Sequence, residues 1–359
     1  MAKRTLYVPI LWAKDGEFGA LRQLAKEVRD RLTPLLEVPP IPWDYADDCP
    51  ARGIDQHLEK MANKIDKAWG NQSPLLLDFE WINPAERLVD GSHPVTYVFD
   101  NARLLGLKLV PVITLARDEA YRDAVAAAVR LDARGACLRV QPDDLTEQDL
   151  GPKVRELLRS LALQISEVDL LIDVRGIQPA ALDAVGASVS EAIEALPRIE
   201  DWRSFVLAGT GFPDTLAGMP QSDVTRVARV EWACWRRFAR QRRLRRIPTF
   251  GDYAISSPAP SDVDPRVMKP SASVRYTADD AWVVFKGRNL KDHGYDQFHD
   301  VCRRVLRAPE YSGNDFSWGH RYIYDCANRR VSRGNLTTWR KVGTSHHLTF
   351  VVEQIATAA

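Results

Sequence analysis

The stretch LLLDFE at residues 75–80 decides the fold, because it is a short apolar run that ends in two carboxylates. The same arrangement returns in LLIDVR at residues 170–175. Apolar runs that lack period-two alternation are typical of parallel strands buried on both faces. We therefore interpret both stretches as central strands of a parallel sheet, each with polar side chains at its downstream end.

Runs of this kind recur along the whole chain, roughly one every 28 to 44 residues, with helical periodicity in the gaps. This cadence is typical of βα units and predicts an α/β fold, a (β/α)8 TIM-like barrel. Pro9 and Pro111 lie within two runs, where they predict bulges or strand starts. The eight predicted strands cover residues 6–11, 35–38, 75–79, 107–115, 136–140, 170–174, 205–208 and, more weakly, 247–255.

The chain of 359 residues exceeds a minimal barrel of roughly 250 residues by about 100. After residue 255 the stretch SSPAPSDVDP marks a connection, followed by a hairpin around WVVF, a helix and a final helix. We predict a barrel core over residues 1–255, a last barrel helix over 339–359, and an α+β insertion between them. That insertion, residues 256–338, follows strand 8 and caps the catalytic face.

Composition is that of a soluble globular protein, with 45% hydrophobic and 27% charged residues and a net charge of +1. Whole-protein attraction to nucleic acid or to an anionic membrane is therefore not indicated. The five cysteines are scattered without a CxxC pair, and no apolar segment approaches the roughly 18 residues of a membrane span. The N-terminal apolar stretch is too short for a signal peptide. These features predict a cytoplasmic protein.

Charged side chains follow several of the predicted strands. Because the downstream ends of barrel strands converge on one face, we expect these side chains to share a pocket. Carboxylates there can act as acid and base or bind Mg²⁺ or Mn²⁺, and arginines can bind phosphate. The competing interpretation is a set of buried ion pairs that only fix the barrel. The candidate catalytic residues are Glu37, Asp78, Glu80, Asp173 and Asp252, the first four also as metal ligands, with Arg117, Arg139 and Arg175 as ligand-binding residues.

Two further groups are candidate ligand-binding residues. Gly209 and Gly211 lie in AGTGFP after strand 7, where many barrels bind phosphate through backbone amides. Lys286, His293 and His320 lie in the predicted cap, from which a side chain can reach the pocket. A structural role is the alternative for each of these residues.

The segment WRRFARQRRLRR at residues 235–246 is the densest charge run. Arginine clusters bind phosphate backbones or acidic protein surfaces, but cations are also favoured at helix C-termini. This run leads into the bottom face of the barrel, opposite the pocket. A solvated face or a protein-binding surface is therefore favoured over nucleic acid.

Several stretches resemble the family known as beta protein, first named from a tailed phage and also found in bacteria. They are YVPILWAKDGEFGALRQL, LTPLLEVPP, LLLDFEW, FDNARLLGLKLVPVITL, WVVFKGR and WGHRYIYDCA, which together cover most of the chain. The resemblance implies no established activity. The family's bacterial occurrence near mobile elements implies a role in phage–host conflict.

Two classes of function follow from these observations. The first is a barrel protein that binds an anionic, phosphate-containing ligand, a nucleotide or nucleic acid, with metal-dependent phosphodiester hydrolysis as its enzymatic form. The second is a non-catalytic sensor or adaptor subunit of a defence or phage–host complex. Its protein partner would bind through the Arg236–Arg246 region and the aromatic residues of the cap.

Overall fold

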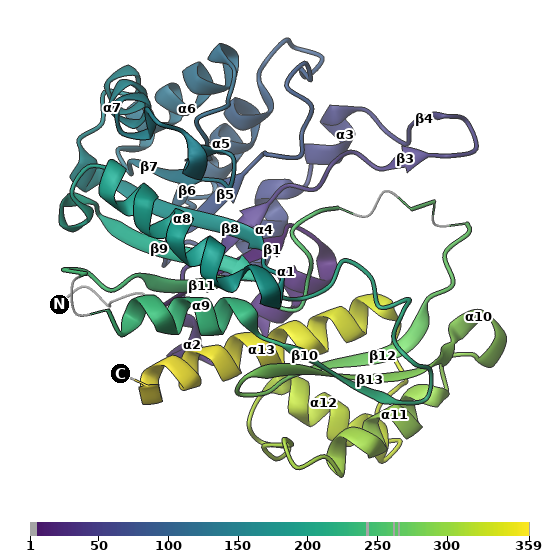
Figure 1. Ribbon diagram of the computed structural model, residues 1–359. Coiled ribbons are helices and arrows are strands. Elements are labelled where there is room, and N and C mark those ends of the chain that lie inside the picture. The colour runs from purple at the N-terminus through teal and green to yellow at the C-terminus, as the bar shows by residue number, and fades with distance from the viewer. Residues whose placement is uncertain (1–5, 242–243, 261–262, 265, 359) are drawn as a thin grey trace.

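The computed structural model describes every residue except 1–5, 242, 243, 261, 262, 265 and 359. Eight parallel strands close into a barrel in the order β1-β11-β9-β8-β7-β6-β5-β2, so the predicted fold is confirmed (Figure 1). The barrel strands are β1 (Tyr7–Trp12), β2 (Leu35–Glu37), β5 (Leu75–Asp78), β6 (Leu109–Ile113), β7 (Ala136–Val140), β8 (Val168–Gly176), β9 (Ser204–Thr210) and β11 (Thr249–Asp252).

Helices follow the strands and form the outer layer of the barrel (Figure 1). Within the described part of the chain, none of them is long and apolar enough to cross a membrane. The barrel helices are α1 (Asp15–Arg22), α2 (Lys26–Arg29), α3 (Ile54–Leu58), α4 (Met61–Trp69), α5 (Pro94–Leu104), α6 (Glu119–Asp132), α7 (Leu150–Ser160), α8 (Leu182–Ala195), α9 (Val230–Ala239) and α13 (Leu336–Ala358), with short 3₁₀ turns η1 (Asp144–Thr146), η2 (Ile165–Glu167), η3 (Pro179–Ala181) and η4 (Ile199–Asp201).

Helix α6 shows how the local sequence sets these elements. The Asp118 side chain accepts a hydrogen bond from the Tyr121 amide at 2.9 Å and caps the N-terminus. The helix buries Val125 and Val129 against the sheet and ends where Ala133 adopts a left-handed backbone. Gly135 follows, and a side chain there would collide with the Glu167 carbonyl. The helix and the turn into β7 are therefore specified locally.

Pro9 and Pro111 lie inside β1 and β6 and start neither strand. In β1, residues 7–9 pair with β11, whereas residues 10–12 pair with β2. In β6, residues 109–111 pair with β5, whereas residues 112 and 113 pair with β7. Each proline thus stands where pairing passes from one neighbouring strand to the other. That position tolerates the missing N–H donor better than the middle of a continuous ladder.

A smaller α+β unit, here called the cap, packs beside the barrel. Its sheet has the order β10-β13-β12, and β10 comes from the loop after β9, ahead of the predicted insertion. Phe212 and Ile255, from the loops after β9 and β11, pack with Trp282 of the cap. The cap elements are β10 (Val224–Ala228), β12 (Ser271–Thr277), β13 (Ala281–Asn289), α10 (Leu290–His293), α11 (Gln297–Leu306) and α12 (Trp318–Ala327).

Helix α13 joins the two parts. It packs against α1 and β1 of the barrel and against α12 and β12 of the cap (Figure 1). A two-stranded arm, β3 (Trp43–Asp44) and β4 (Cys49–Pro50), projects after β2. Arg266, in the connection between β11 and the cap, donates a hydrogen bond to the Tyr45 carbonyl of this arm at 2.8 Å.

Candidate functional site

Alternation along the strands decides which side chains face the interior of the barrel. Leu76 and Leu171 belong to the cluster of apolar side chains inside the barrel, whereas Leu77 and Ile172 pack in the outer layer. Since side chains on one face recur every second residue, Asp78 and Asp173 point inward at the downstream ends of β5 and β8. Both carboxylates are fully buried. The C-terminal end of the barrel, here called the mouth, thus has a polar floor.

Arg139, on β7, lies at the centre of this floor and is fully buried. Its Nη1 donates to carboxylate oxygens of Glu37 at 2.9 Å, Asp78 at 2.7 Å and Glu80 at 2.9 Å. Glu37 and Asp78 end β2 and β5, and Glu80 follows β5, so one guanidinium on β7 binds the ends of two neighbouring strands.

The other side of the guanidinium binds β8. Nε and Nη2 of Arg139 donate to the same oxygen of Asp173, at 3.0 and 2.7 Å. Nη2 also donates to the hydroxyl of Tyr253 at 2.7 Å, and that hydroxyl donates to Asp173 at 2.5 Å. The six residues listed here are called the Arg139 cluster: Glu37, Asp78, Glu80, Arg139, Asp173 and Tyr253.

Turns at the strand ends hold two of these acids in place. Oδ1 of Asp78 accepts the amide of Glu80 at 2.9 Å, and Oδ1 of Asp173 accepts the amide of Arg175 at 2.9 Å. Arg175 adopts a left-handed backbone with φ 53°, which a residue other than glycine rarely takes. This conformation directs the Arg175 side chain back to an ion pair with Glu80. Arg117, from the loop after β6, donates to Asp78 at 3.3 Å.

The charges of the floor nearly cancel. Four carboxylates face three arginines, Arg117, Arg139 and Arg175. Burial raises the pKa of Glu37 to about 8 against the opposing effect of Arg139, with further increases from the neighbouring acids. Burial alone would lower the pKa of Arg139, but Tyr253 and the carboxylates outweigh it and raise that pKa well above its usual range. With Glu37 protonated at neutral pH, the remaining formal charges balance.

Three carboxylates of the floor can hold a metal ion. One oxygen each of Glu37, Asp78 and Glu80 lies within 4.8 Å of the others. Oxygen ligands of this type suit Mg²⁺ and Mn²⁺. However, Nη1 of Arg139 already lies within hydrogen-bonding distance of all three residues. An ion bound there would have to replace the guanidinium as their counter-charge.

Asp252 does not join this floor, so its predicted place in the shared pocket is wrong. On β11, Phe250 packs in the outer layer and Tyr253 faces the interior. Alternation therefore turns Asp252 outward. Its carboxylate accepts from the Tyr7 hydroxyl at 2.5 Å and contacts Nε2 of His347 on α13 at 2.8 Å. Burial opposes ionisation of Asp252, but His347 and its other neighbours outweigh this and lower its pKa.

The glycine cluster after β9 also has a different environment from the one predicted. Gly209 lies within β9, where a side chain would approach Val174 to 2.7 Å. The amide of Gly211 donates to the buried carboxylate of Glu231 at 3.0 Å. An internal carboxylate thus takes the position that we expected for an external anion. Close packing explains both glycines, and the structure does not bring them to the Arg139 cluster.

The three candidate residues of the cap make other contacts than with the Arg139 cluster. Nζ of Lys286 donates to the carbonyls of Leu216 and Met219, at 2.6 and 2.7 Å, and so fixes the loop after β9. His320 is buried among cap aromatics, contacts the Tyr276 hydroxyl at 2.8 Å, and has its pKa lowered to about 4 by burial. His293 ends α10 and is exposed.

Sequence reasoning missed the aromatic residues of the mouth. Trp12 ends β1, pairs in register with Glu37, and lies 5.9 Å from Trp81 between ring centroids. Nζ of Lys14 lies 5.0 Å from the Trp12 ring, and the Arg175 guanidinium lies 5.5 Å from the Trp81 ring. Both tryptophans stand where the acids stand, at downstream strand ends. Their position could have identified the two tryptophans from the sequence, but only the charged residues at strand ends were considered as candidates.

Two buried donors near the mouth lack an acceptor. Among the residues that the structure describes, Nε1 of Trp81 and Nε of Arg117 make no hydrogen bond. A buried N–H without an acceptor costs roughly 1–3 kcal/mol. The Arg117 guanidinium also lies 4.4 Å from the Tyr121 ring. The mouth therefore carries two buried donors without an acceptor and two partly exposed arginines, Arg117 and Arg175, beside a floor whose charged groups are paired.

The arginine run shows mixed roles. Arg246 donates to the carbonyls of Trp202 and Arg203, the second at 2.9 Å, and so helps to close the lower end of the barrel. Arg236, on α9, and Arg240, the residue that follows this helix, are both exposed. Arg242 and Arg243 lie outside the described residues.

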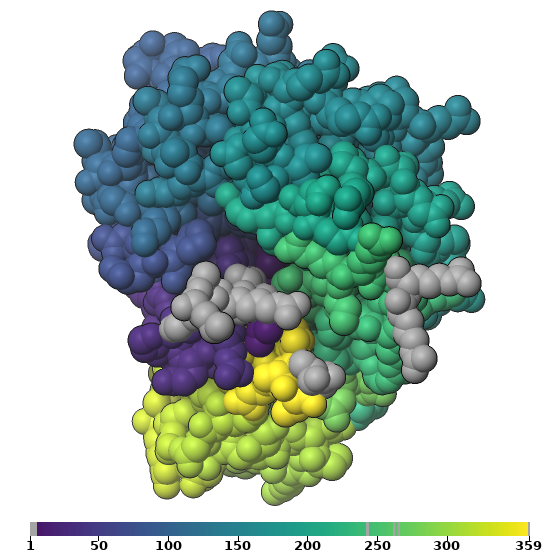
Figure 2. All heavy atoms as spheres, turned by 90° about the vertical axis from the view of Figure 1, so that its left-hand side faces the viewer, coloured from purple at the N-terminus to yellow at the C-terminus, as the bar shows by residue number. Residues whose placement is uncertain are grey.

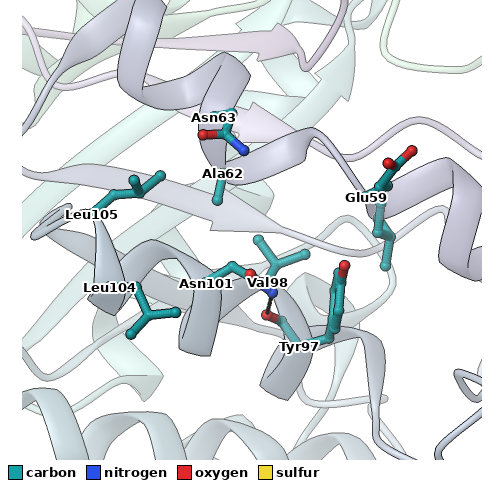
Figure 3. Close-up of a pocket in the computed structure, with 9 residues that line it drawn as sticks. Glu59, Ala62, Asn63, Tyr97, Val98, Asn101, Leu104 and Leu105 are labelled. Atoms are coloured by element: carbon teal, nitrogen blue, oxygen red, sulfur yellow. Dashed lines mark hydrogen bonds between the residues drawn. The ribbon is translucent and has the colours of Figure 1, made fainter.

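A small hollow also occurs on the outer layer, between α4 and α5 (Figure 3). Its volume is about 110 Å³. Within it, the Asn101 side chain donates to the Tyr97 carbonyl at 2.8 Å. Glu59 is the acidic residue among those that line the hollow. It lies in the helix layer, so it does not extend the polar floor at the strand ends.

Fold and site together define a (β/α)8-barrel protein with a buried arginine–carboxylate cluster at the C-terminal ends of its strands. The chain belongs to the Beta protein family, whose model matches residues 7–353. No match was found among curated proteins.

Among solved structures, the chain is similar to an alanine racemase of Clostridium difficile 630 in complex with cycloserine, at 9% identity and a TM-score of 0.33. The matched region covers 76% of this chain and 58% of that one.

Proposed function

We propose that the mouth of the barrel binds an anionic, phosphate-containing ligand without a catalytic step. The observation that carries this proposal is the pair of buried donors without an acceptor, Nε1 of Trp81 and Nε of Arg117. Both nitrogen atoms are buried, so a phosphate oxygen would satisfy them once a shift of the two side chains exposes them at the mouth. Arg175 adds positive charge beside the Trp81 ring, and Lys14 adds positive charge beside the Trp12 ring.

The aromatic residues favour a ligand that also has a flat ring, as a nucleotide does. The indoles of Trp12 and Trp81 approach each other at the mouth, and Trp81 is partly exposed. Aromatic side chains stack on nucleobases, with a contribution of roughly 1–3 kcal/mol per base. Binding without catalysis is favoured because Arg139 engages all four carboxylates of the floor, which leaves none of them as a free general base.

Isothermal titration with ATP, adenosine and inorganic phosphate tests this proposal. We expect ATP to bind more tightly than either fragment. Trp81→Phe keeps the ring and removes the N–H, so it should weaken ATP binding by about tenfold, the effect of roughly 1.4 kcal/mol. Trp12→Phe is the matched control, because its indole N–H is not among the buried donors without an acceptor. Absence of ATP binding, or equal loss in both variants, would contradict the proposal.

Metal-dependent hydrolysis of a phosphate ester is the second candidate, favoured by the approach of Glu37, Asp78 and Glu80 within 4.8 Å. It requires Arg139 to yield its place to Mg²⁺ or Mn²⁺. Thermal unfolding with either ion should then show stabilisation of about 2.7 kcal/mol when the free ion is at 100 times its Kd. Glu80→Gln should abolish that stabilisation. Equal unfolding curves with and without ions would reject the metal site and leave the binding proposal standing.

A further inference from the structure

Three cationic side chains meet where the barrel, the cap and helix α13 come together. Lys14 directly precedes α1, Arg275 lies on β12 of the cap, and Arg340 lies near the start of α13. Figure 1 shows α13 passing from the cap to the barrel, and Figure 2 shows its yellow C-terminal end between the purple N-terminal part of the barrel and the yellow-green cap. These three residues are here called the boundary cations.

The two arginines converge on one backbone oxygen. Nη1 of Arg275 donates to the Ile255 carbonyl at 2.6 Å, and Nη1 of Arg340 donates to the same oxygen at 3.2 Å. Nη1 of Arg340 also donates to Oγ of Ser256 at 2.6 Å. Both acceptors are neutral and lie in the loop after β11. Two like charges this close repel each other, so an anion beside them would be stabilising.

Close packing sets the positions of both arginines. A side chain at Gly16, on α1, would lie 2.6 Å from Cγ of Arg340. One at Gly343, on α13, would lie 2.6 Å from Cδ1 of Ile255 and 3.1 Å from the Arg275 carbonyl. The two glycines therefore let α1, α13 and β12 approach closely. An anion that binds between elements held in this way avoids part of the ordering cost.

A single acid, Glu17 on α1, faces the boundary cations. Its carboxylate lies 3.6 Å from Nε of Arg340, and within the described part of the chain neither Lys14 nor Arg275 forms an ion pair. Burial lowers the pKa of Arg275 well below its usual range and Arg340 lowers it further, whereas Glu17 opposes both. Burial also raises the pKa of Glu17, against the effect of the cations. Three positive charges thus face at most one negative charge.

The boundary cations are also within reach of a ligand from solvent. Lys14 is exposed, and Arg275 and Arg340 are half-buried. The Arg275 guanidinium lies 4.9 Å from the Phe212 ring, and its contact with Ile255 is the one hydrogen bond it makes to the described residues. Its other N–H groups are therefore available to an anion.

We propose that Lys14, Arg275 and Arg340 bind a phosphate group at the boundary between barrel and cap. Guanidinium groups match the geometry of phosphate oxygens and form charge-assisted hydrogen bonds with them. A phosphate bound there joins the start of α1, the cap sheet and α13. The site rests on its own residues and not on the ligand proposed for the mouth, although Lys14, 5.0 Å from the Trp12 ring, borders both.

Isothermal titration with inorganic phosphate tests the proposal. Arg340→Gln should weaken phosphate binding by at least about tenfold, since it removes a charged donor. Lys14→Gln changes an exposed side chain and should also weaken binding, which keeps the test valid where circular dichroism shows that Arg340→Gln is unfolded. Arg237→Gln on α9, whose arginine pairs with Asp183 on α8, is the matched control and should change binding less than about twofold.

Three results would overturn the proposal. The first is no binding of phosphate to the wild-type protein, and the second is equal loss in the Arg237→Gln control. The third is loss of phosphate binding in Trp81→Phe with full binding in Lys14→Gln and Arg340→Gln, which would place the anion at the mouth.

Titration with ATP identifies the source of the phosphate. If Arg340→Gln weakens binding of ATP as well as of phosphate, the group belongs to the nucleotide. If it weakens binding of phosphate alone, the site takes the free ion. Both results support the boundary site. Absence of ATP binding to the wild-type protein contradicts the proposal for the mouth and leaves the phosphate titration as an independent test of this one.

Discussion

Asp173 and Asp252 form the same kind of turn, one near the end of β8 and the other at the end of β11, yet their side chains lie on opposite sides of the barrel wall. Oδ1 of each accepts the amide two residues on, that of Arg175 and that of Ala254. Asp173 faces inward to Arg139, whereas Asp252 faces outward to His347 on α13. The face of the strand on which each residue lies therefore decides its role: Asp173 belongs to the mouth, and Asp252 binds the last helix. Position at a strand end is not sufficient to assign a residue to a barrel site.

The largest expected effect is that of removing the central guanidinium. Arg139→Met removes the counter-charge of the carboxyl groups that Arg139 binds, which are those of Glu37, Asp78, Glu80 and Asp173. Breaking a buried ionic network in this way costs about 3–5 kcal/mol of unfolding free energy. Urea denaturation measures this loss. Asp78→Asn and Asp173→Asn, added to Arg139→Met, should recover part of the stability, and a loss below about 1 kcal/mol in Arg139→Met would show that the cluster is not a coupled network.

Asp252→Asn should have a smaller effect of a different kind. It weakens the hydrogen bonds to Tyr7 and His347 on the outer face, at a cost of about 1–3 kcal/mol. Binding of ATP at the mouth, where it is observed for the wild type, should stay unchanged. Asp173→Asn should alter that binding, because it removes one of the negative charges that Arg139 balances at the mouth. If Asp252→Asn binds ATP more weakly and Asp173→Asn binds it as the wild type does, then Asp252 and not Asp173 belongs to the mouth.

Glu37 gives the inner cluster a pH dependence opposite in sign to that of Asp252, whose lowered pKa gives a contribution to stability that is lost as pH falls. Its pKa rises from an ordinary 4.5 to about 8 on folding, first through burial and then through Asp78 and Glu80 against the effect of Arg139. The folded protein then keeps a proton that the unfolded chain releases, so the free energy of unfolding falls as pH rises between these two values and is fully retained below 4.5. Glu37→Gln should flatten this decline in melts recorded from pH 5 to 8. An unchanged slope would mean that Glu37 is ionised throughout.

The smallest effect is expected at the surface, where Lys153 also bridges two carboxylates. It contacts Glu147 at 2.7 Å and Asp149 at 3.1 Å, and all three side chains are substantially exposed. Water and salt screen such pairs, so Lys153→Ala should be indistinguishable from wild type in urea denaturation. A loss as large as that of Arg139→Met would contradict burial as the reason for the difference.

The sequence predicted the barrel because parallel strands buried on both faces leave continuous apolar runs, as in residues 75–79. It did not predict β10, whose side chains alternate between exposed and half-buried positions and whose partners in β13 lie 53 to 61 residues later. Such pairing depends on contacts distant in sequence, and a short polar strand carries no local signal for it.

The same limit applies to the site. Glu37, Asp78, Glu80, Arg139 and Asp173 were selected together because each follows an apolar run, and the structure places them in one cluster. Tyr253 was missed and Asp252 was wrongly included. The run from 247 to 255 is interrupted by Gly251, so it does not show which of its side chains face the barrel interior. That the arginine at the centre binds all four acids is a property of three-dimensional distance, which residue spacing alone does not contain.

The closure of the barrel has a consequence for synthesis on the ribosome. β1 pairs with β11 through Tyr7 and Phe250, so the first strand emerges about 240 residues before its neighbour. At 5–20 residues per second this interval is on the order of 10 to 50 s. During it, one edge of β1 has no strand to pair with, and an open apolar edge invites pairing with another nascent chain. The His347 that contacts Asp252 emerges a further 95 residues after it, so this contact between β11 and α13 also forms late.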